Sequence, residues 1–463
     1  MREFIEKLQQ IVGVENVKTD PDELERYSKD ETSEIEHQTP LCVVFPTTAE
    51  EVSQIMKLAN LYKVPVTPRG AGTGLSGGAV PIKGGIVLSL EKMNRIVEID
   101  RENMVAVVEP GVITDEIQKL AEEYGLFYAG DPASSESSSI GGNVAENAGG
   151  VKVMKYGPTS HHILGLEVVL PTGEIVNFGG KVLKNVMGYD MVRLFVGSEG
   201  TLGIVTKIIV RLIPKPKYFA TLLVPFDNVE RAVLSVPKIL SESGILPTSI
   251  ELMDKQSALM ASTFLSENIP HQDAECHLII EVDGTDKDGL ARTYINLGEK
   301  LQQMGALEVY IADNRYQRLK IWKFRKAIAE GIIAFRPRHC MEDVSVPIKE
   351  IPKLIMKTYE IAEENKLEVL NFGHVGDGNV HVTFLKPEQM SEQLWKENLE
   401  KALVDLYQTT AKLGGTITGE HGIGIKRKKY LSIFMSKNEL DLMKKLKRIF
   451  DPNNVLNPGK VFD

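Results

Sequence analysis

Short apolar runs separated by glycine-rich loops fill the first half of the chain. Four runs rich in β-branched residues predict strands, at 41–46, 64–68, 85–90 and 104–112. Thr48 and Glu51 form the pattern of a capping box, and apolar residues at helical spacing follow them, so a helix is predicted to begin near residue 49. A last apolar run at 203–214 predicts a further strand, which ends before Pro216.

After Pro216 the pattern changes to apolar strands that alternate with charged segments long enough for helices. Strand candidates lie at 220–226, 247–253, 276–282, 307–312 and 342–348. This alternation predicts a second, α+β domain whose helices pack on one face of a sheet. Glycine-rich loops return near the C-terminus. The expected division is therefore 1–215, 216–415 and a C-terminal segment, 416–463, that returns to the first domain.

Composition narrows the class of protein. The chain has 463 residues, of which 43% are hydrophobic and 25% charged, as in an ordinary globular protein. Its 54 Lys and Arg against 63 Asp and Glu give a net charge of −9, with no basic cluster, which argues against a nucleic-acid surface.

The cysteines and the N-terminus bear on the compartment. Cys42, Cys276 and Cys340 are far apart, which excludes a disulfide framework and a cysteine-type zinc site and suits a reducing compartment. The N-terminal residues lack the apolar core of a signal peptide, and no run approaches the roughly 20 apolar residues of a membrane span. We expect a cytoplasmic protein without a transmembrane segment.

Glycine is concentrated in PRGAGTGLSGG, residues 68–78. Glycine lets the main chain turn its N–H groups toward an anion. Gly72, Gly74 and Gly77 match GxGxxG, but a Rossmann motif needs a helix to begin in this loop. Here the loop runs directly into the strand predicted at 85–90, which leaves no room for a helix. We therefore predict a phosphate-binding loop between strands.

Two further glycine-rich segments extend this picture. Residues 131–150 combine serines with two glycine pairs, and residues 197–203, GSEGTLG, again lead into a strand. A Ser/Gly stretch is more often a flexible linker, but the first segment also carries Ile140 and Val144 between predicted strands. The three segments are therefore expected to converge on one extended, phosphate-bearing ligand.

With these motifs in order, the sequence resembles the vanillyl-alcohol oxidase/PCMH flavoproteins. PRGAGTGLSGG, DPxSS…IGGN…NxGG and GSEGTLGIVT are similar to their FAD-binding signatures. The resemblance is greatest to the branch of the glycolate oxidase D subunit, FAD-linked D-lactate dehydrogenases and D-2-hydroxyglutarate dehydrogenases. It implies a PCMH-type FAD-binding domain and a C-terminal FAD-linked oxidase domain, with an antiparallel sheet covered by helices. It covers the chain from about residue 20 to the C-terminus.

The resemblance also implies FAD with its pyrophosphate on the 69–74 loop and its isoalloxazine at the interface with the second domain. The FAD is expected to be noncovalent, since the loop has no histidine to attach it. The implied cofactor residues are Pro68, Arg69, Gly70, Ala71, Gly72, Thr73, Gly74, Asp131, Pro132, Ser139, Gly142, Asn143, Asn147, Gly150, Tyr156, Gly157, Glu199, Gly200, Gly203, Ile204, Val205 and Asn457.

Histidines mark a second constellation. His374 and His381 flank a predicted hairpin turn in GHVGDGNVH, close enough to share a cation, and Glu420 and His421 lie between glycines in TGEHG. Two imidazoles and one carboxylate leave an open coordination position, as in catalytic metal sites. His374, His381 and Glu420 are therefore candidate ligands for zinc, manganese or iron. Asp377 is assigned to the turn.

The resemblance assigns roles to these residues. In the family, the positions of His374, His381 and Glu420 hold a divalent metal beside the flavin, and the position of His421 is the catalytic base. Arg325 matches the arginine that pairs with the substrate carboxylate, although the sequence alone barely separates this role from that of a surface arginine on an amphipathic helix. An α-hydroxy acid can chelate the metal, which lowers the pKa of its hydroxyl, while the base takes the proton and hydride passes to flavin N5.

Departures from the pattern bear on the substrate. Relatives specific for hydroxyglutarate hold its distal carboxylate with a threonine, a lysine and an asparagine. The corresponding positions here have Ala329, then Cys340 and Met341 without a lysine, and Thr383. We therefore expect a smaller acid, D-lactate or glycolate. Arg336 and Arg338 are weaker candidates for carboxylate binding.

Other functions and the electron acceptor stay open. D-2-hydroxyglutarate dehydrogenase is the alternative within the family. Outside it, a metal-dependent hydrolase and a non-catalytic flavin-binding subunit remain, although the histidine motifs argue against the latter. Since no CxxC cluster supplies iron–sulfur ligands, the onward acceptor is oxygen, a quinone, an electron-transferring flavoprotein or a partner iron–sulfur subunit, through which the protein could associate peripherally with a membrane.

Overall fold

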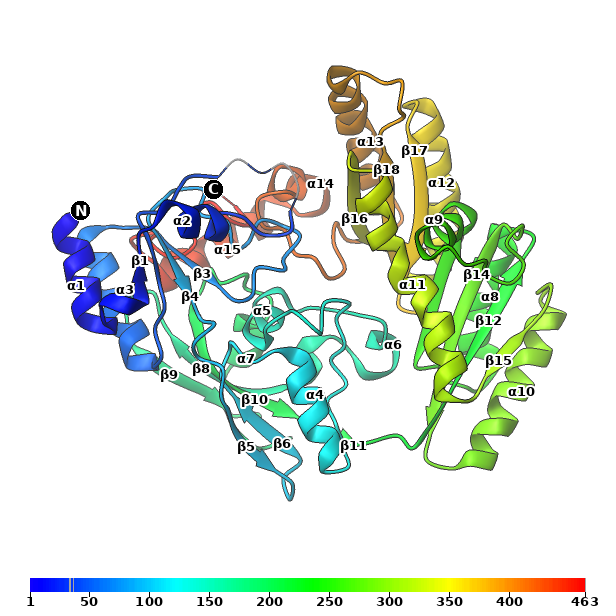
Figure 1. Ribbon diagram of the computed structural model, residues 1–463, viewed down its shortest axis with the longest axis horizontal. Helices are drawn as coiled ribbons and strands as arrows, with labels where there is room; N and C mark the ends of the chain where they lie inside the picture. Colours follow the sequence, from blue (N-terminus) through cyan, green and yellow to red (C-terminus); the bar gives the residue numbers. More distant parts are fainter. Residues whose placement is uncertain (33–34, 36, 463) are drawn as a thin grey trace. The chain divides into compact units, whose positions relative to one another are not determined.

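The computed structural model describes residues 1–32, 35 and 37–462, which form two compact units (Figure 1). Unit 1 contains residues 1–149, 157–215 and 420–463, and unit 2 contains residues 150–156 and 216–419. This differs from the expected division in two places. The short segment 150–156 belongs to unit 2, and the chain returns to unit 1 at Glu420, four residues after the boundary expected at 416.

Unit 1 begins with a small sheet that has the strand order β1-β2-β4-β3. Its strands are β1 (Val17–Lys18), β2 (Cys42–Val44), β3 (Val66–Arg69) and β4 (Ile86–Ser89). β2, β4 and β3 run parallel, while β1 is antiparallel to β2. The accompanying helices are α1 (Arg2–Val12), α2 (Pro21–Tyr27) and α3 (Ala49–Tyr62).

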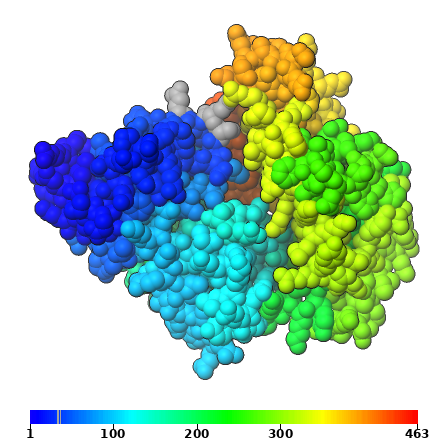
Figure 2. Space-filling model, in the orientation of Figure 1, coloured from blue at the N-terminus to red at the C-terminus, as the bar shows by residue number. Residues whose placement is uncertain are grey.

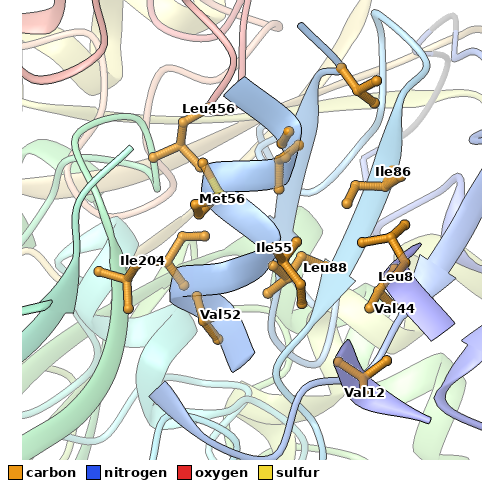
Figure 3. Close-up of a cluster of buried hydrophobic side chains, with 14 of the residues drawn as sticks. Leu8, Val12, Val44, Val52, Ile55, Met56, Ile86, Leu88, Ile204 and Leu456 are labelled. Atoms are coloured by element: carbon orange, nitrogen blue, oxygen red, sulfur yellow. The ribbon is translucent and has the colours of Figure 1, made fainter. Parts of the chain in front are cut away.

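Helix α3 forms where the capping box predicts it. The hydroxyl of Thr48 accepts a hydrogen bond from the Glu51 backbone N–H at 3.2 Å, and the Glu51 carboxylate accepts one from the Thr47 N–H at 2.6 Å. The buried face of α3 packs between α1, the small sheet and residues from later in unit 1 (Figure 3). The residues labelled in this apolar cluster are Leu8, Val12, Val44, Val52, Ile55, Met56, Ile86, Leu88, Ile204 and Leu456.

A second sheet of unit 1 is antiparallel, with strand order β5-β6-β10-β8-β9. Its strands are β5 (Ile96–Asp100), β6 (Val105–Val108), β8 (Ile163–Val169), β9 (Ile175–Gly179) and β10 (Ile204–Arg211). Two short strands, β7 (Leu126–Phe127) and β11 (Ile213–Pro214), pair with each other. The remaining helices of unit 1 are α4 (Thr114–Glu123), α5 (Ile140–Glu146), α7 (Met191–Phe195), α14 (Leu431–Phe434) and α15 (Lys437–Phe450).

Unit 2 is built on a seven-stranded antiparallel sheet with the order β15-β12-β14-β13-β17-β18-β16. The strands are β12 (Tyr218–Phe226), β13 (Ser249–Asp254), β14 (Cys276–Gly284), β15 (Tyr310–Ala312), β16 (His339–Ser345), β17 (Glu368–Gly373) and β18 (Asn379–Leu385). The helices are α6 (Val153–Tyr156), α8 (Val229–Glu242), α9 (Lys255–Leu265), α10 (Lys287–Gln303), α11 (Arg315–Phe335), α12 (Ile351–Glu364) and α13 (Glu392–Lys412).

Helices cover both faces of this sheet, so the expectation that they pack on one face was wrong. α9 and α11 share an apolar cluster with one face, whereas α8, α10, α12 and α13 pack against the other (Figure 1). α11, yellow-green in Figure 2, lies on the surface of unit 2, with Tyr316 and Ile333 exposed and Phe324 and Ile328 buried. Because both faces of the sheet are covered, all seven residues of β14 from Cys276 to Val282 are buried.

The strand predictions are confirmed, and one loop prediction is corrected. Every predicted apolar run overlaps a strand, and no helix interrupts the chain between β3 and β4, as the exclusion of a Rossmann motif required. In contrast, the second glycine-rich segment is not a loop throughout, because Gly141 and Gly142 lie in α5. In the part of the chain that the structure describes, no helix is long and apolar enough to cross a membrane.

Candidate functional site

All three glycine-rich segments of unit 1 line a single pocket. Most of the residues expected at the cofactor lie in its wall: Pro68, Arg69, Gly70, Ala71, Gly72, Thr73, Gly74, Pro132, Ser139, Gly142, Asn143, Glu199, Gly200, Gly203, Ile204, Val205 and Asn457. The wall also contains Glu420 and His421, the first two residues of unit 1 after its return from unit 2.

Glycines let the segments of the pocket wall approach each other closely. A Cβ added at Gly70 would overlap the Ser139 hydroxyl, and one added at Gly72, whose φ is +78°, would overlap the Arg69 guanidinium. The Ser139 hydroxyl is buried and makes no hydrogen bond with any described residue. A buried polar atom in a channel lined by backbone fits a ligand that brings its own acceptors, such as a phosphate.

The C-terminal residues connect the walls of this pocket. The Glu199 carboxylate accepts hydrogen bonds from the backbone N–H groups of Ile423 and Gly424, at 2.8 and 2.6 Å. The side-chain amide of Asn457 donates to the carbonyl oxygens of Gly78 and Glu199, at 3.1 and 3.0 Å. These bonds tie the third glycine-rich segment to the loop that carries Glu420 and His421.

Five expected cofactor residues lie outside the pocket wall: Asp131, Asn147, Gly150, Tyr156 and Gly157. Asn147 instead ends α5 in the left-handed conformation, with φ +54°, and its side-chain oxygen accepts from the Ser160 N–H at 2.8 Å. Gly150 and Tyr156 belong to unit 2, where the Tyr156 hydroxyl donates to Asp283 at 2.7 Å. Asn147 thus has a structural role at the end of α5, and Gly150 and Tyr156 are part of unit 2.

Sequence reasoning missed a group of buried charges behind the pocket. Glu146, at the end of α5, lines the wall, and its Oε2 makes no hydrogen bond with a described residue. Burial, and then the nearby charges of Glu199 and Asp30, raise the pKa of Glu146 well above its usual value. Burial also lowers the pKa of Lys460 to about 7. No local motif indicates this group, because its charged residues lie far apart in the chain and only the fold brings them together.

In unit 2, the two predicted histidines lie side by side. His374 follows β17 and His381 lies in β18, and the ring centroids are 5.2 Å apart with an interplanar angle of 81°. Both side chains are buried, and ligating nitrogens of the two rings come within 4.8 Å of each other. Asp377 serves the turn, as expected, because its carboxylate accepts from the Asn379 N–H at 3.2 Å. The hairpin therefore brings two imidazoles close enough together that they could share one cation.

Arg325 on α11 lies on the same face of the sheet. Its guanidinium is 4.9 Å from the ring centroid of Phe372, which neighbours His381 across the strand pair, and its side chain is 11% exposed. Arg336 and Arg338 instead form ion pairs with Glu368 and Glu392, at 2.8 and 3.5 Å. Of the three arginines, Arg325 is thus the buried one near the histidines.

A carboxylate that sequence reasoning missed connects these groups. Glu251 on β13 is fully buried and contacts both His374 and Arg325. It lies 123 residues before His374, so no local motif joins them.

Of the positions expected to distinguish hydroxyglutarate enzymes, Met341 and Thr383 lie on the same sheet, whereas Ala329 lies on α11. Thr383 pairs with Met341 across β16 and β18, and its hydroxyl is buried without a hydrogen bond to any described residue. Thr383 lies two residues after His381 on β18, so its short, polar side chain is on the same face of the sheet as that histidine.

The chain leaves unit 2 next to the histidine hairpin. The Asp343 carboxylate, on β16, accepts from the Thr418 hydroxyl and the Gly419 N–H, each at 3.0 Å. A Cβ added at Gly419 would lie 2.8 Å from Cγ of Asn379, whose N–H donates to the His374 carbonyl at 3.2 Å. Gly419 is the last residue of unit 2, and the next residue along the chain is Glu420.

Comparisons with known proteins agree with this architecture. Residues 40–179 match the "FAD binding domain" family, and residues 215–461 match the "FAD linked oxidases, C-terminal domain" family. The structure resembles that of p-cresol methylhydroxylase with substrate bound, with a TM-score of 0.80 and 21% identity over 100% of this chain and 97% of the other. At that identity the likeness shows the fold alone.

Relatives found by sequence share a higher identity with this chain than p-cresol methylhydroxylase does. The glycolate oxidase subunit GlcD of Bacillus subtilis is 39% identical over 99% of this chain and 96% of its own length. The D-lactate dehydrogenase of Archaeoglobus fulgidus is 38% identical over 90% of each chain. The D-2-hydroxyglutarate dehydrogenase of Stutzerimonas stutzeri is 34% identical over 99% of this chain and 98% of its own. The chain therefore belongs to the FAD-linked oxidases, in the branch that contains the glycolate oxidase D subunit and the FAD-linked D-lactate dehydrogenases.

Proposed function

We propose that this protein is an FAD- and metal-dependent dehydrogenase that oxidises D-lactate or glycolate to the 2-oxo acid. The observation that carries the proposal is the junction between Gly419 and Glu420. Gly419 is held beside the histidine hairpin in unit 2, and Glu420 and His421 belong to the pocket wall in unit 1. The chain therefore passes directly from a residue beside the histidine hairpin to the residues of the pocket wall.

The residues present fit both groups. The pocket combines closely approaching glycine backbone with the buried Ser139 hydroxyl, which suits the phosphates of noncovalent FAD. His374 and His381, with Glu420 as the third ligand, leave a coordination position for substrate, and zinc, manganese and iron all accept this donor set. A bound divalent cation would lower the pKa of the substrate hydroxyl.

Arg325 and His421 have separate roles in this reaction. The two Nη groups of Arg325 bind the substrate carboxylate, and this contact orients carbon 2. His421 takes the proton of the hydroxyl, and bound FAD would supply the acceptor for the hydride of carbon 2. One proton and one hydride are removed, so the alcohol becomes a ketone or aldehyde and the electron count is balanced. Apolar and short side chains at Ala329, Met341 and Thr383 favour an acid without a distal carboxylate.

The reduced cofactor must pass its electrons onward. The three cysteines of this chain are separate, and Cys42 and Cys276 are buried, so the chain itself offers no cluster ligands. We propose a quinone, an electron-transferring flavoprotein, oxygen or an iron–sulfur partner subunit as the acceptor, in a cytoplasmic protein that such a partner could hold at a membrane. One relative is itself described as a subunit.

Anaerobic stopped-flow spectroscopy tests the proposal. The purified protein is expected to be yellow, and its flavin absorbance is expected to bleach with D-lactate or glycolate more readily than with D-2-hydroxyglutarate. His421→Ala should retain FAD and lose bleaching by substrate, whereas His161→Ala, at an exposed histidine of unit 1, should bleach normally. Full substrate reduction of the His421→Ala flavin would remove this residue from the mechanism.

The same preparation separates the other classes of protein. A colourless protein with metal-dependent hydrolytic activity would be a hydrolase. A yellow protein that no 2-hydroxy acid bleaches, with or without added metal, would be a non-catalytic flavin-binding subunit.

A further inference from the structure

The two carboxylate oxygens of Glu251 contact two different candidate site residues, His374 and Arg325. Oε1 lies 2.7 Å from Nδ1 of His374, and Oε2 accepts a hydrogen bond from Nε of Arg325 at 2.8 Å. The Glu251 side chain is fully buried, and the His374 side chain is only 5% exposed. A buried carboxylate is tolerated only when it is paired in this way.

The contact with His374 decides which ring nitrogen can bind a metal. A carboxylate oxygen at 2.7 Å requires a hydrogen on Nδ1 of His374. In the neutral imidazole the lone pair then lies on Nε2, on the opposite side of the ring. Histidines that bind metals usually donate their other N–H to a carboxylate or carbonyl in this manner.

The contact with Arg325 decides which edge of the guanidinium can bind substrate. Nε is paired with Glu251, and the planar group lies over Phe372, so its orientation is set from two sides. Across the described part of the chain, the Nη1 and Nη2 atoms of Arg325 make no ion pair or hydrogen bond with protein. Two parallel N–H groups are the geometry that binds a carboxylate in a bidentate manner.

We infer that Glu251 is a positioning residue that sets the metal-binding histidine and the substrate-binding arginine in one fixed relation. The relation matters because a 2-hydroxy acid carries its hydroxyl and its carboxylate on adjacent carbons. One rigid carboxylate that orients both partners would favour such acids over acids whose hydroxyl lies further from the carboxylate. The inference rests on the proposed function and adds a residue to it.

The ion pair with Arg325 supports the same role. The Glu251 carboxylate lies 2.8 Å from Nε of Arg325, and both side chains are largely or fully buried, so each charge offsets the other.

A second buried glutamate on the same face provides a matched control. Glu281 on β14 is 5% exposed and forms an ion pair of 2.8 Å with Arg318, seven positions before Arg325 on α11. It also accepts from Trp322 Nε1 at 2.9 Å, and among the described residues the hydrogen-bond partners of its carboxylate are Thr221, Arg318 and Trp322, none of them a histidine. Both glutamates fasten α11 to the sheet, but only Glu251 reaches the candidate site.

The experiment compares Glu251→Gln, Glu251→Asp and Glu281→Gln as FAD-containing full-length proteins. Metal affinity is measured by competition of Zn²⁺ with a chromophoric chelator, and the visible spectrum of the Co²⁺-substituted protein reports the ligand geometry. Flavin reduction by D-lactate and glycolate gives KM and kcat separately.

Glu251→Gln is expected to weaken Zn²⁺ binding by about 10- to 100-fold, the range seen when a metal ligand loses its hydrogen-bond partner. It should also raise KM for the acid and alter the Co²⁺ spectrum. Glu251→Asp keeps the charge but is one methylene shorter, so it should recover part of the metal affinity. Glu281→Gln should change thermal stability without changing Zn²⁺ affinity or KM.

Unchanged Zn²⁺ affinity and KM in Glu251→Gln would overturn the inference. An equal loss of Zn²⁺ affinity in Glu251→Gln and Glu281→Gln would also overturn it, because both variants would then report only on the packing of α11. Failure of the proposed function looks different: the unmodified protein would itself bind no Zn²⁺ or remain oxidised with every 2-hydroxy acid.

Discussion

Gly149 offers a direct test of whether Glu420 binds the metal. A Cβ added at Gly149 would lie 2.6 Å from Oε2 of Glu420 and 2.9 Å from its Cβ. Ordinary contact begins at 3.4 Å, so the carboxylate oxygen of Glu420 would have to move by 3.4 − 2.6 = 0.8 Å in Gly149→Ala. The φ of Gly149 is outside the left-handed region, so alanine adds overlap there but no backbone strain.

The size of this shift should impair metal binding much more than folding. Metal–ligand distances tolerate deviations of only about 0.2 Å, so a shift of 0.8 Å takes Glu420 out of range as a ligand. Both the carboxylate and the Cβ of Glu420 would have to shift, and overpacking of this kind costs about 1–3 kcal/mol, which is less than the roughly 5–15 kcal/mol that stabilises a folded protein. We expect Gly149→Ala to retain FAD, to bind Zn²⁺ at least about tenfold more weakly and to lose bleaching by substrate.

The assay uses chelator competition for Zn²⁺ and the flavin spectrum of the same sample. Gly180→Ala is the matched control, because a Cβ at Gly180 would meet nothing within 4 Å and its φ is also unrestricted. Equal Zn²⁺ affinity in the two variants would refute the assignment of Glu420 as a ligand. Loss of FAD from Gly149→Ala would instead show that the pocket wall around residue 149, and not Glu420, moves to relieve the overlap.

Three further outcomes are expected. Lys447→Met should lower the free energy of unfolding by about 3–5 kcal/mol, measured by urea denaturation, since it leaves the buried Asp451 carboxylate without its cation; a change below 1 kcal/mol would contradict this. Glu146 has a pKa raised first by burial and then by Glu199, so its folded state holds a proton that the unfolded state releases above about pH 4.5. The stabilisation is complete at low pH and is lost as pH rises, so Glu146→Gln should gain stability relative to the unmodified protein between pH 5 and pH 8; an equal difference at both pH values would count against it. Removal of metal with a chelator should leave the yellow colour but abolish bleaching by D-lactate, and Zn²⁺ or Mn²⁺ should restore it; undiminished bleaching after metal removal would exclude a catalytic metal.

The features that could be predicted from the sequence are those decided by neighbouring residues. Alternating and continuous apolar runs predicted the strands, and Thr48 and Glu51 predicted the start of α3, because strand and helix signals extend over a few positions. His374 and His381 were expected to lie together for the same reason, since one short turn joins their strands.

Pairings between distant segments were decided only by the tertiary structure. Glu251 reaches His374 because β13 pairs with β17, and it reaches Arg325 because α11 crosses the same face. The burial of Glu146 and the assignment of residues 150–156 to unit 2 likewise depend on distant segments. Apolar periodicity shows that a segment has a buried face but not which partner covers it, because many pairings bury similar apolar area. The choice among them is made by packing and hydrogen bonding over the whole unit, which no local stretch of sequence contains.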